Sequence, residues 1–103
     1  MPNGHDKNWF RLCGAIDGFR LRYGRWPVRV RMHRLSLQDF GYLFTEQDYA
    51  LIKAKVELVS CEGPMIAEDD SGASYNYSTE GFPDRAPDVR AKDWLGVTPR
   101  PEE

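Results

Sequence analysis

Six arginines and a histidine between residues 20 and 34 give this chain its clearest capacity for chemistry with an anionic partner. No acidic residue interrupts them, and Tyr23 and Trp26 lie among them. A guanidinium binds phosphate or carboxylate oxygens through two parallel hydrogen bonds, and an aromatic ring stacks on nucleic-acid bases. The stretch therefore predicts a surface for acidic protein side chains or, alternatively, for single-stranded RNA or DNA.

A second group of candidate binding residues is a tyrosine pair further along the chain. Tyrosines are common in protein interfaces because they add contact area with a polar end. Both groups also have an internal explanation, in which the arginines pair with acids of this chain and the tyrosines pack on helices. The full candidate set is Arg25, Trp26, Arg29, Arg31, His33, Tyr75 and Tyr77.

The sequence contains no motif that specifies catalysis, a cofactor or a metal ion. It lacks a glycine-rich phosphate loop and a nucleophile elbow. The cysteines and histidines never fall within the short separation, about two to four residues, that structural zinc sites use. We expect a protein that is not an enzyme, without catalytic residues, cofactors or metal. The remaining enzymatic hypothesis makes His33 a general base, which requires a pocket around it.

The distribution of charge along the chain bears on which kind of partner it binds. The chain has 103 residues and a net charge of −2, yet residues 1–55 carry ten Lys/Arg and five Asp/Glu, whereas residues 56–103 carry four and eleven. Either the first half meets an anionic partner or the two halves neutralise each other. We expect the partner to be another protein or a second copy of the chain, with nucleic acid as the alternative.

The cellular location is expected to be the cytoplasm. No apolar run approaches the roughly 18 residues that cross a membrane. The polar start, residues 1–6, lacks the apolar centre of a signal peptide. We therefore expect no membrane contact and reduced thiols at Cys13 and Cys61.

The elements that must position these residues follow from hydrophobic periodicity. Apolar residues recur every three or four positions from Lys7 to Tyr23, which predicts a helix ending at Gly24. Gly14 and Gly18 lie inside it on one side and suggest close backbone packing. Capping motifs that begin at Ser36 and Thr45 predict helices near 36–42 and 46–55. A further helix is expected near 87–96, with Trp94, Leu95 and Val97 docking on the body. Strands are expected at 27–32, 56–61, 65–69 and 73–77, the last two forming a hairpin around Gly72.

The expected architecture is a single small α+β domain over residues 7–97. About four strands form a mostly antiparallel sheet, and the helices pack on one face. Residues 1–6 are expected to be a flexible tail and residues 98–103 a disordered one. The strand at 27–32 alternates between apolar and charged residues, which places it at an edge of the sheet. Such a domain is expected to be a small interaction or regulatory module.

Overall fold

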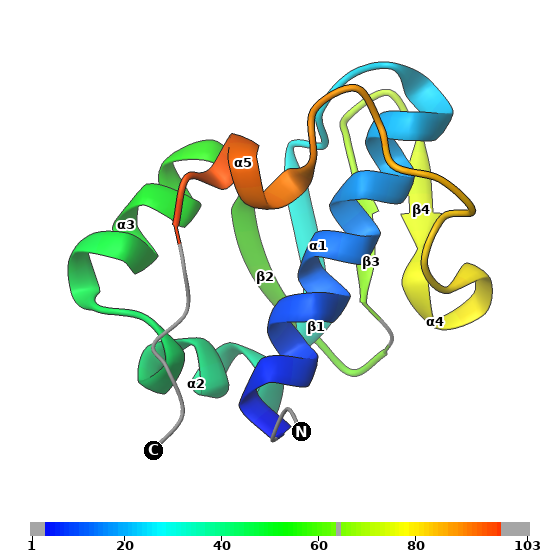
Figure 1. Cartoon of the computed structure of the whole chain (residues 1–103). Helices are drawn as coiled ribbons and strands as arrows, with labels where there is room; N and C mark the ends of the chain where they lie inside the picture. The colour runs from blue at the N-terminus through cyan, green and yellow to red at the C-terminus, as the bar shows by residue number, and fades with distance from the viewer. Residues whose placement is uncertain (1–3, 64, 98–103) are drawn as a thin grey trace.

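A computed structural model describes residues 4–63 and 65–97, which form five helices and four strands (Figure 1). In chain order they are α1 (Gly4–Tyr23), β1 (Arg29–His33), α2 (Arg34–Leu43), α3 (Glu46–Lys55), β2 (Glu57–Cys61), β3 (Ile66–Glu68), β4 (Ser74–Asn76), α4 (Tyr77–Glu80) and α5 (Ala91–Leu95). Helix α1 begins three residues before the expected start. Of the tails expected at 1–6 and 98–103, residues 4–6 belong to α1, and residues 1–3 and 98–103 lie outside the described residues.

The four strands form one mixed sheet in the order β2-β1-β3-β4. β1 pairs with β2 in parallel and with β3 antiparallel, and β3 and β4 form the expected hairpin. The edge position expected for the strand at 27–32 is therefore wrong, because β1 lies inside the sheet. Its alternating sequence arises because only one face of the sheet is covered, so even an interior strand needs polar residues on its other face.

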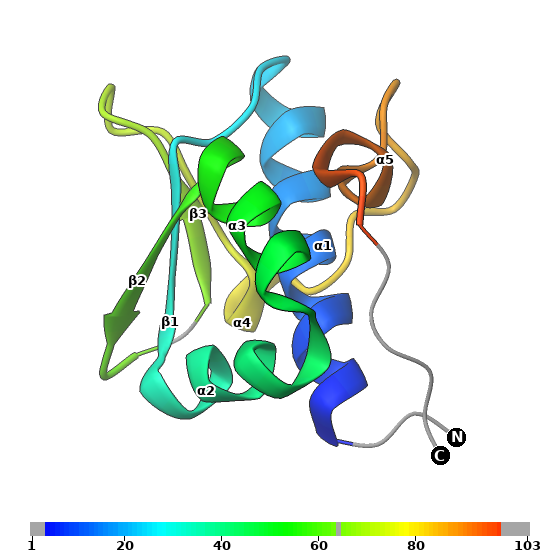
Figure 2. The ribbon, with the colours of Figure 1, turned by 90° about the vertical axis from the view of Figure 1, so that its left-hand side faces the viewer.

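The helices lie on one side of the sheet, as Figure 2 shows. Between the two layers lies a core whose largest fully buried side chains include Phe19, Leu12 and Ile16 of α1 and Val30 and Met32 of β1. Burying a residue of this size stabilises the fold by about 1.5–3 kcal/mol relative to exposing it. The expected α+β class, with the helices on one face, is confirmed.

Two glycines let α1 lie close to the second half of the chain. A Cβ at Gly14 would lie 2.8 Å from Cδ1 of Phe82 and 2.9 Å from Cε2 of Tyr77. A Cβ at Gly18 would overlap the ring of Tyr75. The packing role inferred from their spacing is therefore confirmed, and aromatic rings rather than a backbone fill the space.

The ends of the helices confirm some of the sequence signals and correct others. Thr45 Oγ1 accepts a hydrogen bond from the Asp48 amide at 3.1 Å and caps α3 as expected. Gly24 has a φ of +73° and ends α1. The cap of α2, however, is His33, whose Nδ1 accepts from the Leu35 amide at 3.2 Å. Since β1 runs directly into α2, that helix begins before the capping motif expected at Ser36.

Helix α5 docks on the body through apolar and polar contacts. Leu95 and Val97 are buried, as expected for this segment. Asp17 Oδ1 of α1 accepts a hydrogen bond from the Ala91 amide at 2.6 Å, so one helix caps the start of another. Within the described ranges, no helix combines the length and the apolar character needed to cross a membrane.

Candidate functional site

The uncovered face of the sheet carries the arginines that the sequence singles out. Alternation along β1 buries Val30 and Met32 beneath the helices and directs the residues between them to the opposite face. The strand register places residues of β2 and β3 beside them. We call this surface the open sheet face; its residues are Arg29, Arg31, His33, Glu57, Val59, Cys61, Ile66 and Glu68.

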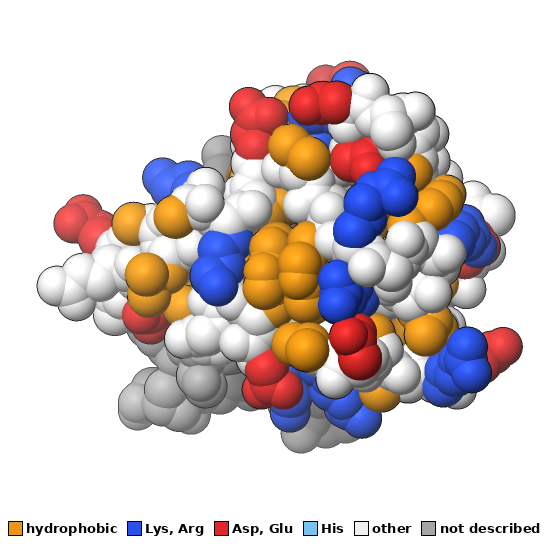
Figure 3. All heavy atoms as spheres, turned by 90° about the horizontal axis from the view of Figure 1, so that it is seen from above, with side chains coloured by type: hydrophobic (Ala, Val, Ile, Leu, Met, Phe, Trp, Pro, Cys, Tyr) orange, Lys and Arg blue, Asp and Glu red, His pale blue; other side chains and the backbone are white. Residues whose placement is uncertain are grey.

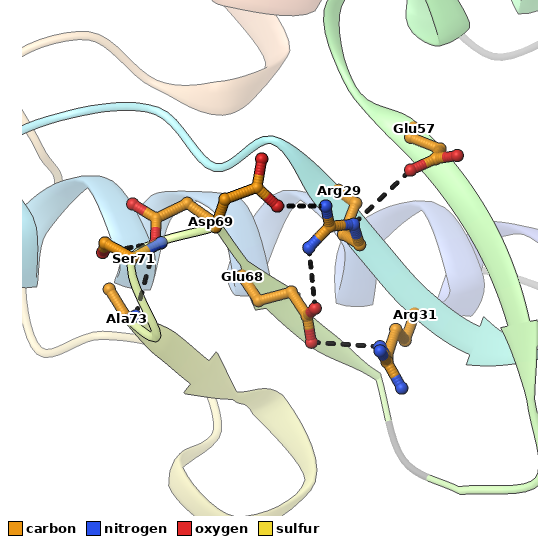
Figure 4. A network of polar contacts seen from close by, with 8 residues as sticks. Arg29, Arg31, Glu57, Glu68, Asp69, Ser71 and Ala73 are labelled. Atoms are coloured by element: carbon orange, nitrogen blue, oxygen red, sulfur yellow. Dashed lines mark hydrogen bonds and ion pairs between the residues drawn. The ribbon is translucent and has the colours of Figure 1, made fainter.

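Arg29 is the centre of an ion-pair network on the open sheet face (Figure 4). The register sets Glu57 on one side of it and Glu68 on the other. Arg29 donates to Glu68 Oε2 at 2.9 Å and to Glu57 Oε1 at 3.4 Å, and it also contacts Asp70. Hydrogen bonds to Asp70 and then Glu68 raise the pKa of Arg29 above its ordinary value. The charge of Arg29 is thus neutralised within the chain.

Arg31 has a different environment two residues further along β1. Its neighbours in register are Val59 and Ile66, both apolar and half-buried. Its guanidinium reaches diagonally to Glu68 Oε1 at 3.1 Å, and its side chain is 49% exposed, against 21% for Arg29. The open sheet face therefore changes from charged at Arg29 to apolar around Arg31.

Arg25 is held by the turn of the β3–β4 hairpin. It donates to Asp69 Oδ2 at 2.8 Å. The other carboxylate oxygen of Asp69 accepts from the Ser71 hydroxyl at 2.6 Å and the Ser71 amide at 2.9 Å. These Ser71 hydrogen bonds, followed by Arg25, lower the pKa of Asp69 to about 2. The arginine stretch and the acidic hairpin therefore satisfy each other.

The aromatic candidates do not lie on the open sheet face. Tyr75 is buried against Gly18, and its hydroxyl donates to the Gly81 carbonyl at 2.8 Å. Tyr77 begins α4 and makes an edge-to-face contact with Phe82, with centroids 5.1 Å apart. The structure thus brings Arg29, Arg31 and His33 together and places the two tyrosines on the helix side of the sheet.

Trp26 belongs to a separate feature at the end of the molecule near α5. Its indole stacks on that of Trp94. The Arg20 guanidinium lies 4.7 Å from the Trp26 ring centre, and the Lys55 ammonium lies 5.7 Å from that of Trp94. Figure 3 shows hydrophobic side chains gathered between Lys and Arg side chains on this end. Both cations and both rings serve to hold α5.

Sequence reasoning did not single out the apolar members of the open sheet face. Val59 and Ile66 flank Arg31 only because β1 pairs with β2 in parallel and with β3 antiparallel. The alternation of β2 carries a partial signal, since Glu57, Val59 and Cys61 share one side. The strand order needed to join that signal to β1 is not encoded locally.

Metal binding and thiol chemistry both depend on where the His, Cys, Asp and Glu side chains lie. Among the described residues, no group of three or more His, Cys, Asp or Glu side chains is arranged to hold a metal ion. Burial, with a smaller contribution from Asp17, raises the pKa of the Cys13 thiol well above its ordinary value. Because the thiolate is the reactive form, Cys13 is poorly suited to nucleophilic chemistry.

Comparison with known proteins finds similarity to a part of a larger protein. No family model and no solved structure matches the chain significantly. The ATP-dependent protease ATPase subunit ClpY of Bacillus pumilus is 45% identical over 61 residues, which cover 59% of this chain and 13% of ClpY. HslU of Bacillus cereus is 36% identical over 61 residues, with the same two shares covered. HslU of Rhodospirillum centenum is 35% identical over 63 residues, 61% of this chain and 14% of HslU.

The matched stretch is thus a small part of these ATPase subunits. It covers 13% to 14% of their length and leaves about two fifths of this chain unmatched. The finding establishes a partial similarity to ATP-dependent protease ATPase subunits, and it does not transfer the activity of the whole subunit.

Proposed function

We propose that the chain is a small protein-binding module whose open sheet face contacts another protein. The supporting observation is that no described helix lies over this face, although it combines charged and apolar side chains (Figure 2). Specific interfaces have an apolar centre and a polar rim. Val59 and Ile66, with the aliphatic part of Arg31 between them, would supply the centre, and Arg29 with its acids would supply the rim.

The partial similarity suggests the class of partner. ClpY and HslU are named as subunits of an ATP-dependent protease. A chain that resembles part of such a subunit can occupy the position of that part against a neighbouring subunit. The chain itself has no G-x-x-x-x-G-K-[S/T] phosphate loop, which supports a binding role rather than nucleotide hydrolysis. We therefore infer that it regulates a protease-associated ATPase in the cytoplasm.

Binding between the chain and purified Bacillus pumilus ClpY tests the proposal. ClpY is immobilised, and the dissociation constant is measured by biolayer interferometry for the wild type, Arg31→Glu and Arg85→Glu. Arg31→Glu should weaken binding by about tenfold or more, because it places a like charge beside Glu68 within the interface. Arg85→Glu makes the same change beside α1, near Gly18 and Leu21, and should leave the dissociation constant unchanged.

Two outcomes would overturn this function. One is a wild-type chain that neither binds ClpY nor changes the rate at which ClpY hydrolyses ATP. The other is an Arg31→Glu variant that keeps the wild-type circular dichroism spectrum and binds as tightly as Arg85→Glu. The first result would exclude ClpY as the partner, and the second would exclude the open sheet face as the binding surface.

Nucleic-acid binding is the second candidate, and the ion pairs weigh against it. Arg25, Arg29 and Arg31 each have a carboxylate partner, so a phosphate backbone would have to displace acids of the chain. Fluorescence anisotropy with labelled single-stranded RNA and duplex DNA distinguishes the two functions. We expect no tight binding at low salt. Tight binding that falls steeply with salt and is lost in Arg31→Glu would favour nucleic acid instead.

A further inference from the structure

A cavity of about 430 Å³ lies where β1 passes into α2. Side chains from four elements line it, among them Arg11 of α1, His33 of β1, Ser36 of α2 and Ser78 of α4. Its volume falls in the range of about 300–1,000 Å³ that small-molecule sites occupy. Apart from His33, these residues lie outside the open sheet face, so the cavity is a separate feature from the surface proposed to bind protein.

The lining of this cavity has an unusual charge balance for an acidic chain. None of its described lining residues is Asp or Glu, whereas a cavity of about 610 Å³ contains Glu80 and Asp84, and one of about 260 Å³ contains Asp17. Arg11 is exposed and forms no ion pair with any described residue. The cavity therefore offers a cation that no carboxylate of the described residues neutralises.

Arg11, His33 and Ser78 of the lining, like the Tyr77 hydroxyl, each have a proton to donate to an anion. The His33 Nδ1 accepts from the Leu35 amide, so in the neutral ring the proton lies on Nε2, which is a donor. Ser78 contributes a hydroxyl and Arg11 a guanidinium. Ser36 is different, because its hydroxyl donates to Asn8 Oδ1 at 3.2 Å and has no second proton.

We propose that this cavity binds a small phosphate monoester. Arg11, His33 and Ser78 come from three different elements, which suits the three peripheral oxygens of a phosphate better than the two oxygens of a planar carboxylate. Met32 and Met65, both buried, line the same cavity and provide apolar contact for the body of the ligand. The expected ligand is thus a free small molecule with one phosphate group and a compact apolar part.

The probe that tests this site is phenyl phosphate, followed by ¹H–¹⁵N correlation spectra of the labelled chain. Benzoate carries the same ring on a carboxylate, and sodium chloride at equal ionic strength controls for screening. We expect saturable shifts at the amides of Arg11, His33 and Ser78 with phenyl phosphate, and much weaker shifts with benzoate. Arg11→Gln should weaken binding by about tenfold or more, because it removes the charged donor. Arg85→Gln is the matched control and should bind as the wild type does.

Each contrary result has a definite meaning. Equal affinity for benzoate and phenyl phosphate would overturn the phosphate assignment. Shifts that also appear at Arg85 and Arg90, or that chloride reproduces, would show nonspecific ion binding and overturn the site. Circular dichroism verifies that Arg11→Gln is folded; Ser78→Ala, an exposed change, provides a second test and should weaken binding about threefold or more. Wild-type affinity in both variants would also reject the proposal.

Discussion

Trp26 and Trp94 stack with their ring centroids 4.3 Å apart and their planes 2° from parallel. Trp26 follows α1 and Trp94 belongs to α5, so the contact joins segments nearly seventy residues apart. Each indole also has a cation over its ring, Arg20 for Trp26 and Lys55 for Trp94. Stacking and cation–π contacts each contribute about 0.5–1.5 kcal/mol beyond area burial. This column fixes the position of α5.

Replacing Trp94 with alanine should therefore loosen α5. We expect Trp94→Ala to lower the free energy of unfolding by about 2–3 kcal/mol, somewhat less than for a fully buried tryptophan. Urea denaturation followed by circular dichroism measures the change. Trp94→Phe keeps an aromatic ring and should lose about 1 kcal/mol. Equal stability of Trp94→Ala and the wild type would contradict the role given to the stack.

Gly18 and Gly41 provide a matched pair of glycine substitutions within helices. An alanine methyl at Gly18 would overlap the Tyr75 ring, whereas nothing lies within 4 Å of the same position at Gly41. Gly18→Ala should cost about 1–3 kcal/mol of stability through overpacking. Gly41→Ala should instead stabilise the chain by about 0.5–1 kcal/mol through helix propensity. Thermal unfolding compares them, and stabilisation by both would show that Tyr75 moves away freely.

The hydrogen bond from the Ala91 amide to Asp17 predicts a difference between two substitutions. Asp17→Ala leaves that amide without its acceptor and should lower stability by about 1–2 kcal/mol, as loss of a helix cap does. Burial raises the pKa of Asp17, so its charged form is disfavoured in the fold. Asp17→Asn keeps an acceptor without that charge and should lose less. Urea denaturation at neutral pH measures both variants, and a larger loss in Asp17→Asn would contradict the cap.

The hairpin carboxylate Asp69 predicts an acid-dependent loss of stability. Its folded-state pKa of about 2 lies below the ordinary value of 3.8, so its contribution is present above about pH 4 and is lost as the pH falls towards 2. Arg22 and Arg20 lower the pKa values of Glu80 and Asp88, so the stability that these two carboxylates contribute is also lost as the pH falls. The pKa of Asp17 is raised, so its ionisation has the opposite effect and favours the folded state more as the pH falls.

Urea midpoints measured between about pH 5 and pH 2 test this linkage. Asp69→Asn has no carboxylate to become protonated as the pH falls, so its midpoint should fall less than that of the wild type over this range. Asp84→Asn, an exposed change outside the hairpin, is the control and should follow the wild-type curve. Parallel curves for Asp69→Asn and the wild type would exclude a contribution from this carboxylate.

Local periodicity predicted most elements because each needs only neighbouring residues. The stripe from Trp9 to Tyr23, the cap at Thr45 and the hairpin around Gly72 are all read from spacing within one segment. The position of β1 within the sheet was predicted wrongly because alternation reports which faces are covered, not how many neighbours a strand has. The short helix α4 was not predicted, since its four residues are too few for a helical period.

The candidate site was predictable in its residue types and not in its arrangement. The sequence indicated that the arginines could be paired internally, and it left that alternative open. Only the register, which sets Glu57 and Glu68 on either side of Arg29, decides the question. Likewise, the sequence favoured packing of Tyr75 and Trp26 and left exposure open, and only the structure places Gly18 and Trp94 against them.

The parallel pairing of β1 with β2 also determines when the sheet can assemble. Arg29 and Glu57 are partners across a crossover that contains α2 and α3, whereas β3 and β4 are joined by a short turn. Closing the longer loop carries the larger entropy loss, so contacts of high sequence separation form late. We expect α1 and the hairpin to form early in folding and β2 to join last. A destabilising change in β2 should then accelerate unfolding while leaving the folding rate nearly unchanged.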